Sequence, residues 1–465
     1  MHVDKHQPLK NLLGELDRRG PRYTSYPPAP MFTYDFGPDA LVNALQESNR
    51  PQARPLSIYA HVPFCHQLCY YCGCTKIILS NNARNQGKID AYLHTLYGEA
   101  ELFARYLDPR REVQQIHLGG GTPNSFNPEQ LADFLSDLRA CFRVAPGAEV
   151  GIEVDPRCIE LQDLDRYRLA GFNRISIGVQ DFDPLVQKAI NREQSKKHIA
   201  DLISEARFVG FGGINVDLIY GLPRQSMKTF GHTLDELVKM RPDRVAVYSY
   251  AHLPQQFRAQ RLIRLEELPD PTLKLDLFDL AVHKLTDAGY RYIGMDHFAL
   301  PEDELARSLN SGHLQRNFQG YSTRGGADMI GLGMSAISSI GKVYAQNAKT
   351  LPIYSRRIEN GEFATVRGLH LTEEEGIRRD LIHQLMCSGK IDMDAFGQAH
   401  GIQFEQYFER DLGRLRPYLK KGLIRNQDHV LEVTESGRYL LRPLAMAFDP
   451  YVNQPENGAT YSRVI

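Results

Sequence analysis

The chain of 465 residues is too long for one ordinary domain and predicts a large core with one or two appended units. With 55 Lys and Arg against 56 Asp and Glu, it carries no global charge that would draw it to nucleic acid or to an anionic membrane. Hydrophobic residues make up 42% and charged residues 24%, which excludes an intrinsically disordered chain and predicts a folded globular protein.

The beginning of the chain shows no sign of a targeting segment. "MHVDKHQPLKNLL" lacks a basic stretch followed by an apolar run, and no later stretch approaches the roughly 20 apolar residues that a membrane-spanning helix needs. Seven cysteines in so long a chain do not make a disulfide framework. We therefore expect a cytoplasmic protein without a membrane partner.

The first part of the chain contains "PRYTSYPPAP", whose prolines argue against a continuous helix. No strand-and-helix rhythm is present before about residue 55. We predict that residues 1–54 form an N-terminal extension that covers the active site of the unit that follows.

From about residue 55 onward, short β-branched apolar runs alternate with amphipathic helical stretches. Such units build a parallel sheet, and six of them predict an α/β fold, a partial (β/α)6 TIM-like barrel, which with an added extension spans 55–360. A doubly wound open sheet is the alternative. The six runs are "LSIYAHV" (56–62), "VQQIHLG" (113–119), "EVGIEVD" (149–155), "NRISIGV" (173–179), "INVDLIYG" (214–221) and "RVAVYSY" (244–250).

In a barrel of this kind, functional residues collect where the strands end and the helices begin. A doubly wound sheet also gathers its ligands at these ends, so the expected location of the site does not depend on the choice between the two folds. The residues at or just beyond the six strand ends are Cys65, the glycines 119–121, Glu153, Gln180, Asp217 and Ala251.

After about residue 360 the pattern changes. "LTEEEGIRRDLIHQLM" opens with a capping box, Thr372 with Glu375, and predicts an amphipathic helix. "GLIRNQDHVLEVTESG" indicates two strands around a polar turn, so residues 361–465 are expected to form a smaller, mostly helical, winged-helix-like domain. Such folds often bind DNA, but the basic run here is short, and we expect no nucleic-acid partner.

Four cysteines stand close together in "HVPFCHQLCYYCGCTKI": Cys65, Cys69 and Cys72 form C-x3-C-x2-C, and Cys74 follows. Structural zinc is one candidate, but it usually takes two distant C-x2-C pairs, and Cys74 or His66 would have to complete a very tight loop. An iron–sulfur cubane fits better, because three thiolates hold three irons and leave the fourth open to a ligand.

The cysteine motif after the first strand resembles that of the radical S-adenosylmethionine (SAM) superfamily, and "HLGGGTP" resembles its glycine motif after the second strand. Glycines at this turn let backbone groups approach a charged ligand closely. The resemblance then narrows to the family of oxygen-independent coproporphyrinogen III oxidases. The segments that carry it, in order, are "PRYTSYP", "YAHVPFCHQLCYYCGCTKI", "GGGTP", "IEVDPR", "ISIGVQDFD", "NVDLIYGLPRQ", "YIGMDHFALPEDELA", "RNFQGYSTR" and "GLGMSAISSIGKVYAQN".

The resemblance implies an oxidoreductase of porphyrin and haem biosynthesis. Cys65, Cys69 and Cys72 would ligate a [4Fe–4S] cluster whose fourth iron binds SAM. One electron would then yield a 5′-deoxyadenosyl radical that removes hydrogen from the β-carbon of a propionate, after which CO2 leaves and one electron passes to an acceptor. Two propionates of coproporphyrinogen III would become vinyl groups, giving protoporphyrinogen IX. A cofactor suits this step because an unactivated C–H bond offers no acid for a side-chain base.

The resemblance also implies two SAM molecules. Tyr59, Gly120 and Glu153 would contact the SAM on the cluster, and Tyr59, Glu153, Arg192 and Ile337 would take part in catalysis. The residues that would line the second SAM, or the space between the two, are Tyr71, Gly121, Thr122, Gln180, Arg192, Asp217, Ala251 and Ile337.

The expected partners are coproporphyrinogen III and a reducing electron donor such as flavodoxin or ferredoxin, and a monomer is expected. Arg22 and Arg324 are candidates to pair with substrate carboxylates. A haem-binding chaperone of the same superfamily, without decarboxylase activity, is the alternative function. Cys74 and the N-terminal "PRYTSYP" favour the oxidase.

Overall fold

The structure, a computed structural model, describes residues 19–79, 84–311, 314–318, 320–452 and 461. The opening segment "MHVDKHQPLKNLL", in which we expect no targeting signal, lies outside these residues, as does part of the predicted 361–465 domain. No helix among the described residues is long and apolar enough to cross a membrane.

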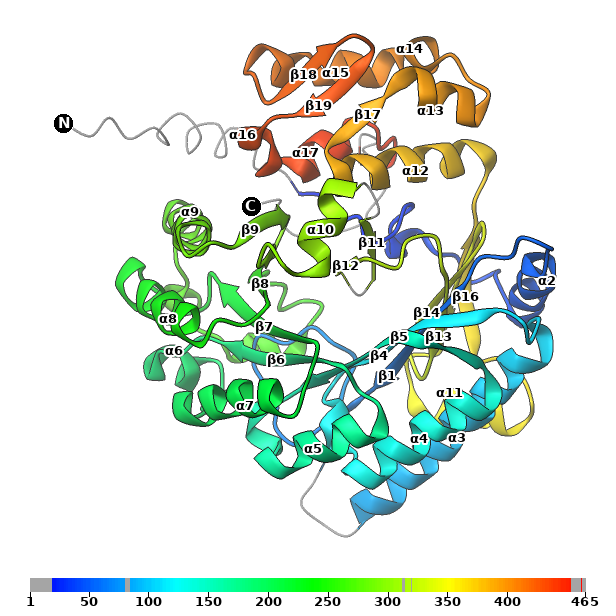
Figure 1. Cartoon of the computed structure of the whole chain (residues 1–465), viewed down its shortest axis with the longest axis vertical. Coiled ribbons are helices and arrows are strands. Elements are labelled where there is room, and N and C mark those ends of the chain that lie inside the picture. Colours follow the sequence, from blue (N-terminus) through cyan, green and yellow to red (C-terminus); the bar gives the residue numbers. More distant parts are fainter. Residues whose placement is uncertain (1–18, 80–83, 312–313, 319, 453–460, 462–465) are drawn as a thin grey trace.

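A parallel sheet forms the centre of the fold, as the alternating pattern predicts (Figure 1). Each apolar run identified in the sequence forms one of its strands, and each strand pairs in parallel with the next. The six strands are β1 (Leu56–Val62), β4 (Glu112–Gly120), β5 (Arg143–Val154), β6 (Arg174–Gln180), β7 (Gly213–Tyr220) and β8 (Arg244–Ser249).

Helices cover the outer face of this sheet and bury its apolar side chains (Figure 1). Their first residues follow the rules for helix starts: Asn127 caps α4 in a capping box, and Ser226 does the same for α8. The helices are α3 (Arg84–Tyr106), α4 (Pro128–Cys141), α5 (Leu161–Ala170), α6 (Pro184–Ala189), α7 (Lys196–Phe208), α8 (Met227–Met240) and α9 (Pro271–Asp287).

The sheet continues beyond the six strands on both edges and reaches twelve strands. Next to β1 lies β13, which is parallel to it, and antiparallel strands follow on that side and beyond β8. The added strands are β13 (Asp328–Leu332), β14 (Ile337–Ile340), β15 (Val343–Asn347) and β16 (Thr365–His370) on one side, and β10 (His297–Ala299) and β9 (Arg291–Gly294) on the other.

Shorter elements complete the barrel unit. The hairpin β11–β12 lies between the sheet and the C-terminal domain (Figure 1). These elements are α2 (Pro38–Ser48), β2 (Phe64–Cys65), β3 (Ile77–Ile78), α10 (Glu304–Ser311), β11 (Gln315–Asn317), β12 (Gly320–Ser322), α11 (Leu351–Glu359) and the 3-10 turns η1 (Ala29–Met31), η2 (Pro123–Ser125), η3 (Pro156–Cys158), η4 (Arg258–Leu262) and η5 (Leu265–Glu267).

The C-terminal domain has its own hydrophobic core and a small three-stranded sheet, the winged-helix-like arrangement that the sequence predicts. The capping box of Thr372 and Glu375 begins its first helix as expected. Its elements are α12 (Glu373–Ser388), β17 (Lys390–Asp392), α13 (Met393–His400), α14 (Phe404–Tyr407), α15 (Glu409–Lys420), β18 (Ile424–Gln427), β19 (Val430–Val433), α16 (Glu435–Arg438) and α17 (Leu441–Met446).

The N-terminal segment packs into the C-terminal domain. Tyr23 and Tyr26 belong to that domain's hydrophobic core, and the Tyr23 hydroxyl donates to Asp449 at 2.9 Å. Arg442 donates to the carbonyl oxygens of Gly20 at 2.5 Å and of Pro21 at 3.2 Å. The two ends of the described chain therefore close together over the barrel, while the division at residues 54 and 360 stays a prediction.

Candidate active site

The cysteine loop leaves the carboxyl end of β1, where the sequence places it. Cys65 ends β2 and is buried, as is Cys69, whereas Cys72 is half-buried and Cys74 is exposed. The Thr122 hydroxyl lies 3.4 Å from Cys65 Sγ and donates to it. The thiols of this loop thus lie beside the glycine turn that follows β4.

Two guanidinium groups approach the second thiol. Nη2 of Arg157 and Nη1 of Arg192 each lie 3.4 Å from Cys69 Sγ. Asp155 holds both arginines, with its Oδ2 at 2.6 Å from Arg157 Nη2 and 3.1 Å from Arg192 Nη1. Burial opposes ionisation of Asp155, but Arg192 and Arg157 together lower its pKa to about 2. N–H donors of this kind stabilise a thiolate that ligates iron.

The remaining two cysteines of the motif interact with each other. The Cys74 peptide N–H donates to Cys72 Sγ at 3.4 Å, and Lys76 Nζ lies 3.0 Å from the Cys72 carbonyl oxygen. A hydrogen bond from the Cys74 thiol lowers the pKa of Cys72, and the Lys76 charge lowers it further against the effect of burial. The peptide N–H and the thiol of Cys74 therefore both contact the Cys72 sulfur.

The donor set fits an iron–sulfur cluster. Among the described residues, no three His, Cys, Asp or Glu side chains are arranged to hold a single metal ion. A cubane requires no such convergence, because each thiolate binds a different iron. Burial raises the pKa of Cys65 to about 11, so a metal at this thiol must displace its proton.

The glycine turn at the end of β4 is closely packed against β1. Gly120 has a φ of +107°, and a Cβ there would lie 2.3 Å from His61 Nδ1. A Cβ on Gly121 would lie 2.7 Å from the carbonyl carbon of Pro63. The Gly121 N–H donates to the Val62 carbonyl at 2.8 Å, which joins the turn to the residues before the cysteine loop. Only glycine fits these two positions.

Glu153 is anchored to the same turn. Its Oε2 accepts the Gly120 N–H at 3.1 Å, and its Oε1 lies 3.2 Å from His117 Nε2. The His117 ring stacks on Tyr59 with centroids 6.2 Å apart. Burial raises the pKa of Glu153, but the hydrogen bond and charge of His117 and the Gly120 N–H outweigh it, so the net shift is downward. Glu153 is thus an ionised acceptor at the mouth of the barrel.

The pKa of Asp217 is shifted in the opposite direction from that of Glu153. Asp217 lies within β7 and accepts hydrogen bonds from Asn215 Nδ2 at 2.9 Å and from Ser176 Oγ at 3.1 Å. Burial, followed by the negative charge of Glu153, raises its pKa to about 7 despite these bonds. Two neighbouring carboxyl groups whose environments separate their pKa values are typical of a functional site.

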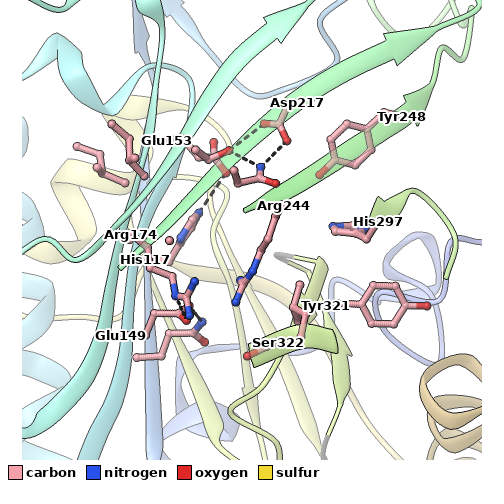
Figure 2. A pocket seen from close by; sticks show the side chains of 18 residues that line it. His117, Glu149, Glu153, Arg174, Asp217, Arg244, Tyr248, His297, Tyr321 and Ser322 are labelled. Carbon is pink, nitrogen blue, oxygen red and sulfur yellow. Dashed lines mark hydrogen bonds and ion pairs between the residues drawn. The ribbon is translucent and has the colours of Figure 1, made fainter. Parts of the chain in front are cut away.

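The interior of the barrel is a polar cavity of roughly 750 Å³ that is open to solvent. Figure 2 shows Glu153 and Asp217 at one end and Glu149 and Arg174 further toward the amino ends of the strands. Arg174 Nε lies 2.5 Å from Glu149 Oε2, and its Nη2 lies 2.7 Å from Glu304 Oε2. Ion pairs therefore close this end of the cavity.

Arg192 is the most constrained of the predicted site residues. Besides its contacts to Asp155 and Cys69, its Nη2 donates to the Gly178 carbonyl at 2.6 Å. Its Nε is buried and has no hydrogen-bond partner. Such an atom suits a carboxylate or carbonyl oxygen of a ligand, because a buried N–H without an acceptor is costly.

The structure places four further predicted site residues on different elements around the barrel. Gln260 Nε2 donates to the carbonyl oxygens of Tyr71 at 2.9 Å and of Ala251 at 3.1 Å, which holds these two segments together. Gln180 ends β6 with a φ of +67°. Ile337, at the first position of β14, lines a second cavity of roughly 420 Å³ together with Tyr59, so the structure brings a distant antiparallel strand to the barrel mouth.

Several site residues escaped the sequence prediction. His117, Asp155, Arg157, Arg174 and Arg244 contact the predicted residues or line the cavity. The sequence does contain one signal of these residues, because the barrel strands alternate polar and apolar residues. Parallel strands that are buried on both faces are instead apolar throughout. That alternation indicates a polar interior.

Comparison with known proteins agrees with this geometry. Residues 59–237 match the Radical SAM superfamily, and residues 371–440 match the HemN C-terminal domain. The barrel and its cysteine loop thus define a radical SAM protein, a class whose cofactors are a [4Fe–4S] cluster and SAM.

Relatives narrow the assignment. The chain is 46% identical to the oxygen-independent coproporphyrinogen III oxidases of Salmonella typhimurium and Escherichia coli, with 98% of each chain covered, and 43% identical to that of Pseudomonas aeruginosa, with 98% of each covered. The solved coproporphyrinogen III oxidase (HemN) from Escherichia coli superimposes with a TM-score of 0.88 at 46% identity, covering 92% of this chain and 97% of that one. The chain belongs to the family of oxygen-independent coproporphyrinogen III oxidases, and the haem-chaperone alternative is not favoured.

Proposed function

We propose that the protein catalyses the oxygen-independent oxidative decarboxylation of two propionate side chains of coproporphyrinogen III to vinyl groups, giving protoporphyrinogen IX. Identity of 46% over nearly the whole length of relatives with this activity in their name supports the proposal. The observation that carries it is the cysteine loop beside an ionised Glu153 and the glycine turn, at the mouth of a polar barrel.

Cys65, Cys69 and Cys72 would hold three irons of the cluster, and the fourth iron would be open to SAM. When bound, the cluster and SAM supply a 5′-deoxyadenosyl radical, which can remove hydrogen from an unactivated C–H bond. The chain contributes hydrogen-bond donors to the thiolates: the Thr122 hydroxyl at Cys65 and the Arg157 and Arg192 guanidinium groups at Cys69.

Tyr59, Gly120 and Glu153 are proposed to bind the SAM that contacts the cluster. Glu153 offers an ionised acceptor for an ammonium group or ribose hydroxyls, and its position is fixed by Gly120 and His117. Tyr59 presents an aromatic ring, which suits a cationic sulfonium.

A second SAM is proposed deeper in the same region. The unpartnered Nε of Arg192 suits its carboxylate, and Asp217 offers a carboxyl group that is partly protonated near neutral pH. The residues proposed to line this molecule or the space between the two are Tyr71, Gly121, Thr122, Gln180, Arg192, Asp217, Ala251 and Ile337.

The finer partners are also proposals. We propose a monomeric, cytoplasmic enzyme that receives electrons from a flavodoxin or ferredoxin. The described cysteines are all free thiols, which suits a reducing compartment. Cys74 is exposed, and its neighbour Gly73 packs against Phe257. The exposed Arg258 and Arg261 follow Phe257 along the chain, and their positive charge suits docking of an acidic electron-donor protein near the cluster loop.

An anaerobic assay tests the proposed function. Reconstituted protein is mixed with SAM, dithionite and coproporphyrinogen III, and the tetrapyrroles are identified by mass. We expect a product that has lost two carboxyl groups, and a cysteine-to-serine variant of the cluster loop as the inactive control. Tight haem binding with unchanged coproporphyrinogen would instead support the chaperone alternative and overturn the proposal.

A further inference from the structure

A third cavity, of roughly 790 Å³, lies on the side of β13. Its walls come from Thr24 of the N-terminal segment, from the beginning of β1 and β13, from the β11–β12 hairpin and from α12 of the C-terminal domain. Four arginines and one histidine line it, and we call it the arginine pocket: Arg54, Arg316, Arg324, Arg379 and His383.

The charge in the arginine pocket is unbalanced. Asp328 and Asp380 are the acidic residues among its lining. Asp328 Oδ2 is already paired with Arg111 Nη2 at 2.6 Å, from outside the lining set, and Asp380 Oδ1 with Arg379 Nε at 3.2 Å. The pocket therefore keeps an excess of positive charge over what its own carboxylates neutralise, which favours an anionic occupant.

Hydrogen-bond donors in the pocket also lack acceptors. Arg316 is only 3% exposed, and its Nη1 has no partner, although its Nε donates to the Arg22 carbonyl at 3.1 Å. Arg324 Nε is buried without a partner as well. Buried donors of a charged group are normally satisfied, so these atoms indicate a missing acceptor. A carboxylate matches the fork of an arginine best.

The arginine pocket shares part of its wall with the cavity that contains Tyr59 and Ile337. Phe318 and Met329 line it and also line the smaller cavity that contains Tyr59 and Ile337. A ligand that spans the two cavities would place one edge among the arginines and the opposite edge near the proposed SAM residues.

We propose that the arginine pocket binds the carboxylates of the two propionates that the reaction leaves in place; this inference rests on the proposed function. In coproporphyrinogen III the two reacting propionates sit on neighbouring rings and the two retained ones on the opposite pair of rings. Anchoring the retained pair at Arg316 and Arg324 aims the reacting edge of the macrocycle at Tyr59 and Ile337. Arg22 is excluded from this role, because its Nη1 lies 3.4 Å from Asp296 and its Nη2 donates to the Ser249 carbonyl.

Protoporphyrin IX is a direct probe, because its only carboxylates are the retained pair, and its dimethyl ester lacks both charges. Fluorescence quenching measures the binding of each compound to the cluster-loaded enzyme. We expect Arg324→Gln to weaken protoporphyrin IX binding at least tenfold and to leave the weak binding of the ester unchanged. Arg324→Lys keeps the positive charge but loses the forked guanidinium, so its affinity for protoporphyrin IX should lie between those of the parent and Arg324→Gln.

The same variants are measured for turnover. Arg324→Gln should raise the KM for coproporphyrinogen III at least tenfold while iron content and SAM affinity stay as in the parent. Arg316→Gln is the second variant, and its thermal midpoint shows whether it folds. Arg143→Gln, a change at an exposed arginine paired with Glu112, is the matched control and should change none of these quantities.

The outcomes separate the two proposals. The inference is overturned if Arg324→Gln binds protoporphyrin IX as tightly as the parent does, or if its affinities for the acid and for the dimethyl ester fall equally. A loss of SAM affinity in place of a loss of porphyrin affinity would assign the pocket to SAM. If the parent binds protoporphyrin IX through these arginines but does not decarboxylate coproporphyrinogen III, the proposed function fails and the pocket assignment stands.

Discussion

Gly119→Ala offers a test of Glu153 that leaves every charge in place. A Cβ at residue 119 would lie 2.8 Å from Glu153 Oε1 and 2.9 Å from its Cδ, and the backbone there is not in the left-handed region. The alanine methyl group must therefore displace the carboxylate, which is the movable end of a side chain. The displaced group cannot keep both the Gly120 N–H at 3.1 Å and His117 at 3.2 Å.

The magnitude follows from these contacts. A hydrogen bond to a charged group contributes about 1.5–3 kcal/mol, and a difference of about 1.4 kcal/mol is tenfold in affinity. A displaced Glu153 should lose one such hydrogen bond to SAM, which should weaken SAM binding roughly 10- to 100-fold. The pKa of Glu153 should rise at the same time, because the contacts that lower it are lost.

Anaerobic calorimetric titration of the cluster-loaded protein with SAM measures the effect. Gly147→Ala is the matched control, since it lies on the same strand as Glu153 and a Cβ there meets nothing within 4 Å. Iron content should be equal in both variants and the parent. SAM affinity within threefold of the parent in Gly119→Ala, or an equal loss in Gly147→Ala, would refute the reasoning.

Three further predictions follow from the site. Serine in place of any of the three proposed cluster ligands should abolish iron retention after anaerobic reconstitution, whereas Cys74→Ser should keep iron, as measured by iron and sulfide analysis; equal iron in all variants would contradict the ligand set. The pKa of Asp217 is raised to about 7, so the stability that its protonated form provides is complete below pH 4 and is lost as pH rises through about 7. The melting temperature of Asp217→Asn relative to the parent should therefore increase between pH 4 and pH 8, and a constant difference would argue against the shift. Gly210→Ala places alanine at a positive φ in open space and should cost about 1–2 kcal/mol of stability in chemical denaturation, whereas Gly120→Ala, whose methyl group also meets His61, should cost more and abolish turnover.

Much of the fold could be predicted from the sequence because its signals are local. Each barrel strand is a short stretch rich in β-branched residues and bounded by turn residues, and α12 begins at a capping box that is visible in four consecutive positions. The cysteine loop is also local, since its ligands fall within one stretch of the chain. The glycines at 120 and 121 predict close approach of the backbone to a charged ligand, which stays a prediction; the structure adds that both are packed against His61 and Pro63.

The contacts that organise the site could not be predicted, because they join residues far apart in sequence. Arg174 meets Glu304, and Ile337 reaches Tyr59 only because β13 adds to the sheet beside β1. No local pattern marks the strand β17, which is three residues long and becomes a strand by pairing with β19. Tertiary pairing, rather than propensity, decides such elements.

The junction of the two chain ends sets the order in which the protein can be assembled. During synthesis the six parallel strands of the repeat are made once β8 has emerged, and the strands that extend the sheet on both edges follow later. Tyr23 and the carbonyl oxygens of Gly20 and Pro21, made much earlier, must wait for Asp449 and Arg442. Until its final helices leave the ribosome, the nascent chain therefore lacks the contacts that hold its N-terminal segment against the C-terminal domain.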